Sequence, residues 1–129
     1  MRIYDRVLLV TGGSSVIGAD IANMLVEHAG TLMLSDIVVY AVAAQAAVLV
    51  AQARFVRADI ASEADGHTAV AAALAAFTDI HGMATCASVA SAATCLRRNV
   101  IHALASYRRV IDIKLLVSVN MLRLASAAV

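Results

Sequence analysis

The chain has 129 residues and a formal net charge of +1, from ten basic and nine acidic residues. This length suits one domain with a core of its own, and the balanced charge argues against a nucleic-acid-binding protein. The cysteines Cys86 and Cys95 form no CxxC pair and the four histidines show no ligand spacing. We therefore expect no metal site and no disulfide framework, and we favour a reducing, cytoplasmic setting.

Hydrophobic residues make up 62 % of the chain, against about 45–50 % in soluble domains. This composition keeps a membrane-associated protein as one alternative. The most apolar run, residues 37–53, contains Gln45 and Gln52 and is shorter than the roughly 20 residues that a transmembrane helix needs. We therefore do not expect a membrane span.

Short apolar runs alternate with longer helical patterns, which is typical of βαβ units and a parallel sheet. The first run is continuously aliphatic, as in a strand buried on both faces. In chain order, the expected elements are a strand at 7–10, a helix from Val16, a strand at 31–35, a helix over about 41–52, a strand at 54–57, a helix that runs from its cap Ser62 to about Phe77, and a strand at 83–86. Asp65, three residues after Ser62, is expected to complete a capping-box-like start of the third helix.

The remaining part of the chain predicts a connection and one long helix. Residues 87–101 form no clear pattern and include Arg97 and Arg98, so they predict an irregular segment. From His102 to Val129, apolar residues recur at helical spacing. This predicts a single amphipathic helix that continues to the last residue.

The strongest local pattern is the glycine-rich stretch 11–18, which lies between the first expected strand and the first expected helix. A tight turn at this place aims free backbone N–H groups and the positive end of a helix at a phosphate group. The stretch therefore predicts a dinucleotide-binding loop.

Acidic residues follow the second and third expected strands. Asp36 comes 18 residues after Gly18, where a carboxylate can accept hydrogen bonds from a ribose diol and repel a 2′-phosphate. An acid at this position favours NAD over NADP as the cofactor. The alternative interpretation is that Asp36 is a solvated acid at the end of a strand, with no role in binding. Asp59 and Ile60 are candidates for a position beside an adenine ring.

The chain resembles the short-chain dehydrogenase/reductase family over essentially its whole length. The resemblance rests on the glycine-rich stretch 11–18, on Asp36, on Asp59 and Ile60, and on the segments 86–88 and 108–115, which occur in the order and spacing of that family. Within the family, the segments 102–113 and 120–124 are similar to type 2 3-hydroxyacyl-CoA dehydrogenases. The resemblance implies an α/β fold, a Rossmann-type parallel sheet of strand order 3-2-1-4 with helices on both faces, truncated before the fifth strand. Residues 1–129 would then form a single NAD-binding half-domain.

The resemblance also implies NAD-dependent oxidation of a secondary alcohol, of the 3-hydroxyacyl-CoA or hydroxysteroid type. The residues that it assigns to NAD are Gly12, Ser14, Ser15, Ile17 and Gly18 at the pyrophosphate, Asp36 at the adenosine ribose, and Asp59, Ile60, Cys86, Ala87 and Ser88 around the adenine and ribose.

Three positions depart from the family pattern. Val16 and Ser88 stand where the family has glycines close to the cofactor, and Lys114 stands at the position of a catalytic asparagine. A valine at position 16 adds a branched side chain where backbone is expected to contact the pyrophosphate, and it would be strained at a positive φ. We therefore expect NAD binding to be weak or lost.

The acid–base pair of the family is a tyrosine followed four residues later by a lysine. None of Tyr4, Tyr40 and Tyr107 has a lysine at that spacing, so we assign no catalytic residue and expect this chain to be inactive alone. A hydrolase triad built on Ser14 or Ser15 is disfavoured, because the sequence has no nucleophile elbow.

Two further hypotheses remain open beside the dehydrogenase half. The chain is a non-catalytic remnant that serves as an oligomerisation or interaction module, with self-association through the C-terminal helix, or it is a membrane-associated protein. Two residue pairs, Arg97–Arg98 and Arg108–Arg109, either attract a CoA phosphate or are merely solvated. Cys86 is expected to be a buried small hydrophobe.

Overall fold

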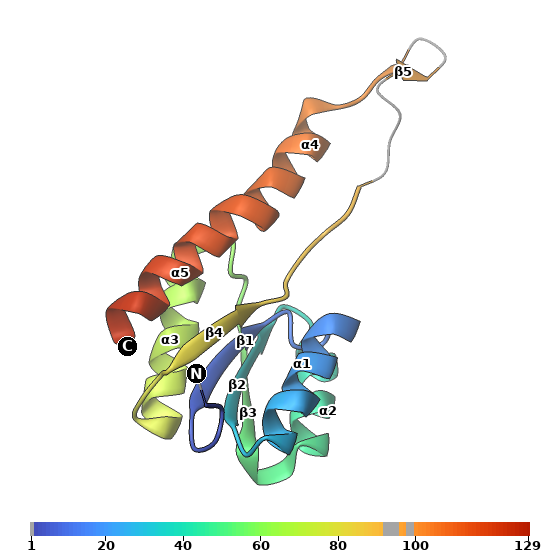
Figure 1. Cartoon of the computed structure of the whole chain (residues 1–129). Coiled ribbons are helices and arrows are strands. Elements are labelled where there is room, and N and C mark those ends of the chain that lie inside the picture. The colour runs from blue at the N-terminus through green and yellow to red at the C-terminus, as the bar shows by residue number, and fades with distance from the viewer. Residues whose placement is uncertain (1, 92–95, 98–99) are drawn as a thin grey trace.

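The computed structural model describes residues 2–91, 96–97 and 100–129 and shows an α/β fold (Figure 1). Its elements, in chain order, are β1 (Val7–Thr11), α1 (Val16–Glu27), β2 (Thr31–Asp36), α2 (Val39–Val48), the 3₁₀ turn η1 (Val50–Gln52), β3 (Ala53–Arg57), α3 (Glu63–Phe77), β4 (Gly82–Thr85), β5 (Leu96–Arg97), β6 (Val100–Ile101), α4 (Leu104–Ile111), the π-helical segment η2 (Asp112–Leu116) and α5 (Val117–Ala128).

The four longest strands form one parallel sheet in the order β3-β2-β1-β4. This confirms the predicted strand order 3-2-1-4. All five residues of β1 are buried, because β1 lies between two strands and under helices on both faces. The register pairs Thr11 at the end of β1 with Ser35 on β2 and Thr85 on β4, so the carboxyl ends of these strands meet at one edge.

Helices cover both faces of the sheet, as predicted (Figure 1). Successive side chains of a strand point to opposite faces, so the strands divide their apolar residues between two clusters. Leu8 and Leu34 belong to the cluster on the α1 and α2 side, and Leu9 and Met33 belong to the cluster with residues of α3 and α5. The second cluster includes Val117, which therefore fixes α5 against the sheet.

Two predicted helix starts are confirmed by side-chain caps. The Ser15 side chain caps α1 by accepting a hydrogen bond from the Gly18 N–H, and that of Ser62 caps α3 by accepting one from the Asp65 N–H. Asp65 does not complete a reciprocal capping box. Its carboxylate instead accepts a hydrogen bond from the Asp59 N–H at 2.8 Å, which ties the loop after β3 to α3.

The middle of the chain differs from the prediction in its element bounds. The second helix begins at Val39 and ends at Val48, and a 3₁₀ turn follows, because the chain must reverse tightly before β3 begins at Ala53. The fourth strand lies one residue earlier than predicted, since its register follows β1 rather than its own apolar run.

The predicted irregular connection, 87–101, contains a short antiparallel pair, β5 and β6. Residues 92–95 and 98–99, which include Cys95 and Arg98, lie outside the described residues. The long helix is also not one regular α-helix. It begins at Leu104, and at η2 the Val117 N–H bonds to the Asp112 carbonyl, five residues back. Such a turn takes up one extra residue and changes which side chains face the sheet.

Within the described ranges, no helix has the length and apolar character needed to cross a membrane. No group of three or more histidine, cysteine or acidic side chains there could hold a metal ion.

Candidate functional site

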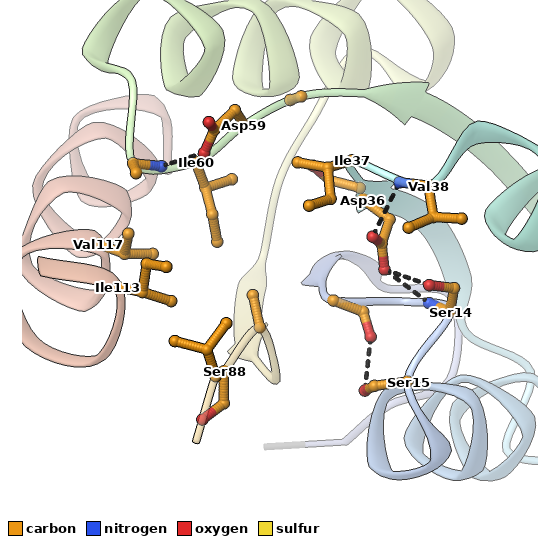
Figure 2. A pocket seen from close by; sticks show the side chains of 16 residues that line it. Ser14, Ser15, Asp36, Ile37, Val38, Asp59, Ile60, Ser88, Ile113 and Val117 are labelled. Atoms are coloured by element: carbon orange, nitrogen blue, oxygen red, sulfur yellow. Dashed lines mark hydrogen bonds between the residues drawn. The ribbon is translucent and has the colours of Figure 1, made fainter. Parts of the chain in front are cut away.

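A cavity of about 230 Å³ opens at the carboxyl ends of β1, β2 and β3, on the side covered by α5. Figure 2 shows Ser14 and Ser15 on one side of this cavity, Ile113 and Val117 on the other, and Ile60 pointing into the space between them. In open α/β sheets, ligands bind outside the carboxyl ends of the strands, so this cavity is the candidate functional site.

The structure brings eight of the eleven predicted site residues to this cavity. The residues that line it are Gly12, Ser14, Ser15, Asp36, Asp59, Ile60, Ala87 and Ser88 from the predicted set, with Ser35, Ile37, Val38, Ala58, Ala61, Val89, Ile113 and Val117 in addition. Ile17, Gly18 and Cys86 do not line it.

The turn from β1 to α1 can only be made with glycine at position 12. Gly12 has a φ of +68°, and a Cβ there would lie 2.4 Å from the Ala87 backbone nitrogen. The Gly12 and Gly13 N–H groups both donate to the Ser35 carbonyl, at 2.8 and 3.2 Å. The turn is therefore held against β2 on one side and against the chain after β4 on the other.

Gly18 supports the turn rather than the cavity wall. A Cβ on Gly18 would lie 2.1 Å from the Gly12 carbonyl oxygen, so only glycine allows the helix to start this close to the turn. The Ser15 hydroxyl donates to that same carbonyl at 2.7 Å and accepts from the Gly18 N–H at 3.0 Å. Ile17 does not line the cavity and is 67 % exposed.

Asp36, at the end of β2, is held by three hydrogen bonds, which Figure 2 draws as dashed lines. Oδ2 accepts from the Ser14 N–H at 3.0 Å and from the Ser14 hydroxyl at 2.5 Å, and Oδ1 accepts from the Val38 N–H at 3.1 Å. A carboxylate has about four acceptor positions, so some capacity for a ligand hydroxyl remains.

The loop after β3 is fixed from two sides. The Asp59 Oδ1 accepts a hydrogen bond from the Ala61 N–H at 3.1 Å, while the Asp59 N–H donates to Asp65. Arg57 forms an ion pair with the same Asp65 carboxylate at 3.3 Å. These contacts hold Ile60 as an apolar wall of the cavity, with only 6 % of its surface exposed.

Cys86, which we expected beside the adenine and ribose, does not line this cavity; its side chain packs with the cluster on the α1 and α2 face. Cys86 is the first residue after β4, and the chain that follows it brings Ala87 and Ser88 to the cavity. Burial raises the pKa of the Cys86 thiol. This fits the expected role of a small hydrophobe.

Neither Val16 nor Lys114 lines the cavity. Val16 is 81 % exposed at the first position of α1. In the described ranges, the non-glycine residues with positive φ are Asp5, Ala29 and Thr78, so Val16 carries no such strain. Lys114 belongs to η2, whose residue Ile113 lines the cavity in its place.

Sequence reasoning missed the wall formed by the long helix. Ile113 and Val117 lie four residues apart in a segment predicted as a uniform amphipathic helix, and nothing local distinguishes them from its other apolar residues. Ile37 and Val38 directly follow Asp36, so their position beside the site could have been inferred from the end of the second strand.

The parallel sheet, the glycine turn and an acidic residue at the end of β2 together define a Rossmann-type α/β fold. The family model described as short chain dehydrogenase matches residues 6–129. The chain belongs to the short-chain dehydrogenase family.

Individual relatives also match almost the whole chain. It is 33 % identical over 126 residues to human 3-hydroxyacyl-CoA dehydrogenase type-2 and 32 % identical to the Bos taurus protein of that name, spanning 96 % of this chain and 48 % of each relative. A short-chain dehydrogenase/reductase from Brucella melitensis, described as a glucose/ribitol dehydrogenase, superimposes with a TM-score of 0.91 at 25 % identity, over 100 % of this chain and 54 % of that one. The chain spans about half the length of these relatives.

Proposed function

We propose that the chain is the NAD-binding half of a dehydrogenase that oxidises a secondary alcohol. The observation that carries this proposal is Asp36, which lines the cavity at the end of β2 and is oriented by Ser14 and Val38. A carboxylate at this position can accept hydrogen bonds from a ribose diol and disfavours a 2′-phosphate. It therefore supports NAD as the cofactor rather than NADP.

In this proposal, the apolar side chains of the cavity enclose the adenine ring. Ile37, Ile60, Ile113 and Val117 offer an apolar slot of suitable character beside Asp36. The substrate class, a 3-hydroxyacyl-CoA or a hydroxysteroid, is proposed from the resemblance and from the name of the human relative. A reducing cytoplasm is proposed as the location.

We expect the isolated chain to show no dehydrogenase activity. Proton exchange in this family needs a tyrosine with a lysine four residues later, and no tyrosine in these 129 residues has one. The measurement is NAD reduction with 3-hydroxyacyl-CoA and hydroxysteroid alcohols by protein freed of host enzymes. A rate above that of buffer would contradict the assignment.

The cofactor proposal is tested by NAD titration of the chain and of Asp36→Ala. Loss of the carboxylate should weaken binding by about ten- to a hundredfold, since hydrogen bonds to a charged group contribute about 1.5–3 kcal/mol. The matched control is Asp20→Ala, because Asp20 is exposed on α1. Circular dichroism confirms that both variants fold. Equal NAD affinity of Asp36→Ala and the unchanged chain would refute the proposed site.

A second candidate function is self-association without catalysis. Large apolar side chains on α4, η2 and α5 are more than half exposed; they are Leu104, Tyr107, Leu115, Leu116, Val119 and Leu122. A monomeric protein rarely leaves so many such residues along one helix in water. This observation supports an interaction module built on the C-terminal helix.

A further inference from the structure

The backbone N–H groups of the glycine turn are almost all used within the chain. The N–H groups of Gly12 and Gly13 donate to the Ser35 carbonyl, and that of Ser14 donates to the Asp36 carboxylate. Within the turn itself, the Ser15 N–H donates to the Gly12 carbonyl, the Gly18 N–H to the Ser15 hydroxyl and the Ala19 N–H to the Ser15 carbonyl. Among the described residues from 12 to 19, only the N–H groups of Val16 and Ile17 have no acceptor. The turn therefore offers few free donors to a phosphate group.

The side chains next to these two free N–H groups are apolar. Val16 is 81 % exposed and Ile17 is 67 % exposed. A phosphate that reached the two N–H groups would exchange part of its water shell for contact with branched hydrocarbon. Loss of water without compensating hydrogen bonds is unfavourable for a charged group.

The charges around the cavity are also unfavourable for a phosphate. Among the described residues, those that line it include two acids, Asp36 and Asp59, and neither lysine nor arginine. The Asp36 carboxylate lies directly against the turn, because Ser14 donates to it through both its N–H and its hydroxyl. A pyrophosphate at the turn would stand beside this negative charge, and like charges repel.

The size of the cavity limits how much of a ligand it encloses. Its volume is about 230 Å³, below the roughly 300–1,000 Å³ of sites that surround a whole drug-sized ligand. An apolar slot with one oriented carboxylate matches an aromatic base joined to a ribose diol. The enclosed part is therefore of nucleoside size.

We propose that the cavity recognises its ligand as a nucleoside: the adenosine end supplies nearly all the affinity, and the pyrophosphate adds almost none. The inference rests on the proposed function, which identifies the nucleoside as the adenosine of NAD. It names Asp36 as the polar anchor of the ribose and the apolar slot as the site of the base.

The test is a titration series on the full 129-residue chain with adenosine, AMP, ADP-ribose and NAD, followed by calorimetry or NMR shifts. We expect the four dissociation constants to agree within about threefold. We also expect the NAD value to change less than about twofold when salt is raised, since contacts to phosphate are screened by ions. ADP-ribose or NAD binding at least about tenfold tighter than adenosine would overturn the inference.

The series separates failure of the inference from failure of the proposed function. If NAD binds and Asp36→Ala weakens it, but adenosine is at least about tenfold weaker than NAD, only the nucleoside inference is wrong. If none of the four ligands binds at millimolar concentration, the proposed NAD site is wrong and the inference fails with it. If Asp36→Ala binds adenosine as tightly as the unchanged chain does, the proposal that Asp36 anchors the ribose is refuted.

Discussion

Thr11 and Ser35 lie opposite each other on β1 and β2, and Ser35 is one of the residues that line the cavity. Both residues are fully buried, and within the described part of the chain neither hydroxyl has a hydrogen-bond partner. A buried polar group without a partner costs about 1–3 kcal/mol of desolvation free energy. These two side chains therefore lower the stability of the sheet at the edge where the site is built.

We predict that Thr11→Val raises the free energy of unfolding by about 1 kcal/mol, because it keeps the branched shape and removes the unpaired hydroxyl. Urea unfolding measures the change. The matched control is Thr31→Val at the opposite end of β2, where the residue is only partly buried and little change is expected. A lower stability for Thr11→Val would show that its hydroxyl does have a partner.

Val16 is the residue at which the turn departs most clearly from a phosphate-binding loop. We predict that Val16→Gly strengthens NAD binding and leaves adenosine binding unchanged, because it uncovers the free N–H groups of positions 16 and 17. The control is Val48→Gly, since Val48 is 73 % exposed at the end of α2. Calorimetry with both ligands decides the point. Equal NAD affinity before and after Val16→Gly would mean that the turn does not contact the pyrophosphate.

At the scale of elements, α3 and α5 pack closely on the sheet face below the cavity. A Cβ on Gly66 of α3 would lie 3.0 Å from the Asn120 Nδ2 and 3.0 Å from the Leu124 Cδ1, so the helices approach each other at this glycine. Arg123 of α5 also forms an ion pair with Glu63, which lowers the pKa of that carboxyl. The pair is exposed, so close packing matters more than charge.

We predict that Gly66→Val lowers the free energy of unfolding by about 2 kcal/mol, since overpacking a tight contact typically costs about 1–3 kcal/mol. Ala71→Val is the control, because Ala71 is exposed on the same helix. This variant should lower the free energy of unfolding by only a few tenths of a kcal/mol, through the weaker helix propensity of valine. Thermal and urea unfolding report both variants. If Gly66→Val is no less stable than Ala71→Val, α5 can move away from α3 at little cost.

At the scale of the whole molecule, the described sheet ends on one side at β4, which pairs only with β1. The residues of β4, from Gly82 to Thr85, include no charged side chain that would discourage pairing with another chain. The exposed apolar side chains of α4, η2 and α5 add to this surface. Burial of several hundred Å² of such surface between two chains, at roughly 25 cal/mol per Å², would contribute about 10 kcal/mol to the free energy of association.

We therefore predict that the chain self-associates at micromolar concentration. The double variant Leu115→Glu, Leu122→Glu should shift it toward monomer, because both residues are more than half exposed on the C-terminal helix. Val48→Glu, on the opposite layer, is the control. Sedimentation velocity measures the species. A folded monomer for the unchanged chain at these concentrations would contradict the prediction.

The sequence by itself determined the order of the elements, the parallel sheet and the polar residues at its carboxyl edge. These features depend on local physics: a buried strand is continuously apolar, a helix starts at a cap such as Ser15 or Ser62, and a strand-to-helix turn at Gly12 needs a glycine. Because parallel strands end at one edge, the order of residues along the chain was enough to bring Asp36 and Asp59 to the same site.

Only the tertiary structure decided how the cavity is closed and which donors remain free in it. Ile113 and Val117 reach the site from a helix far along the chain, and the π-helical turn at η2 sets which of its residues face inward. Three N–H groups of the turn, those of Gly12, Gly13 and Ser14, donate to Ser35 and Asp36, which are distant in sequence. Such contacts depend on packing between elements, and local periodicity carries no information about them.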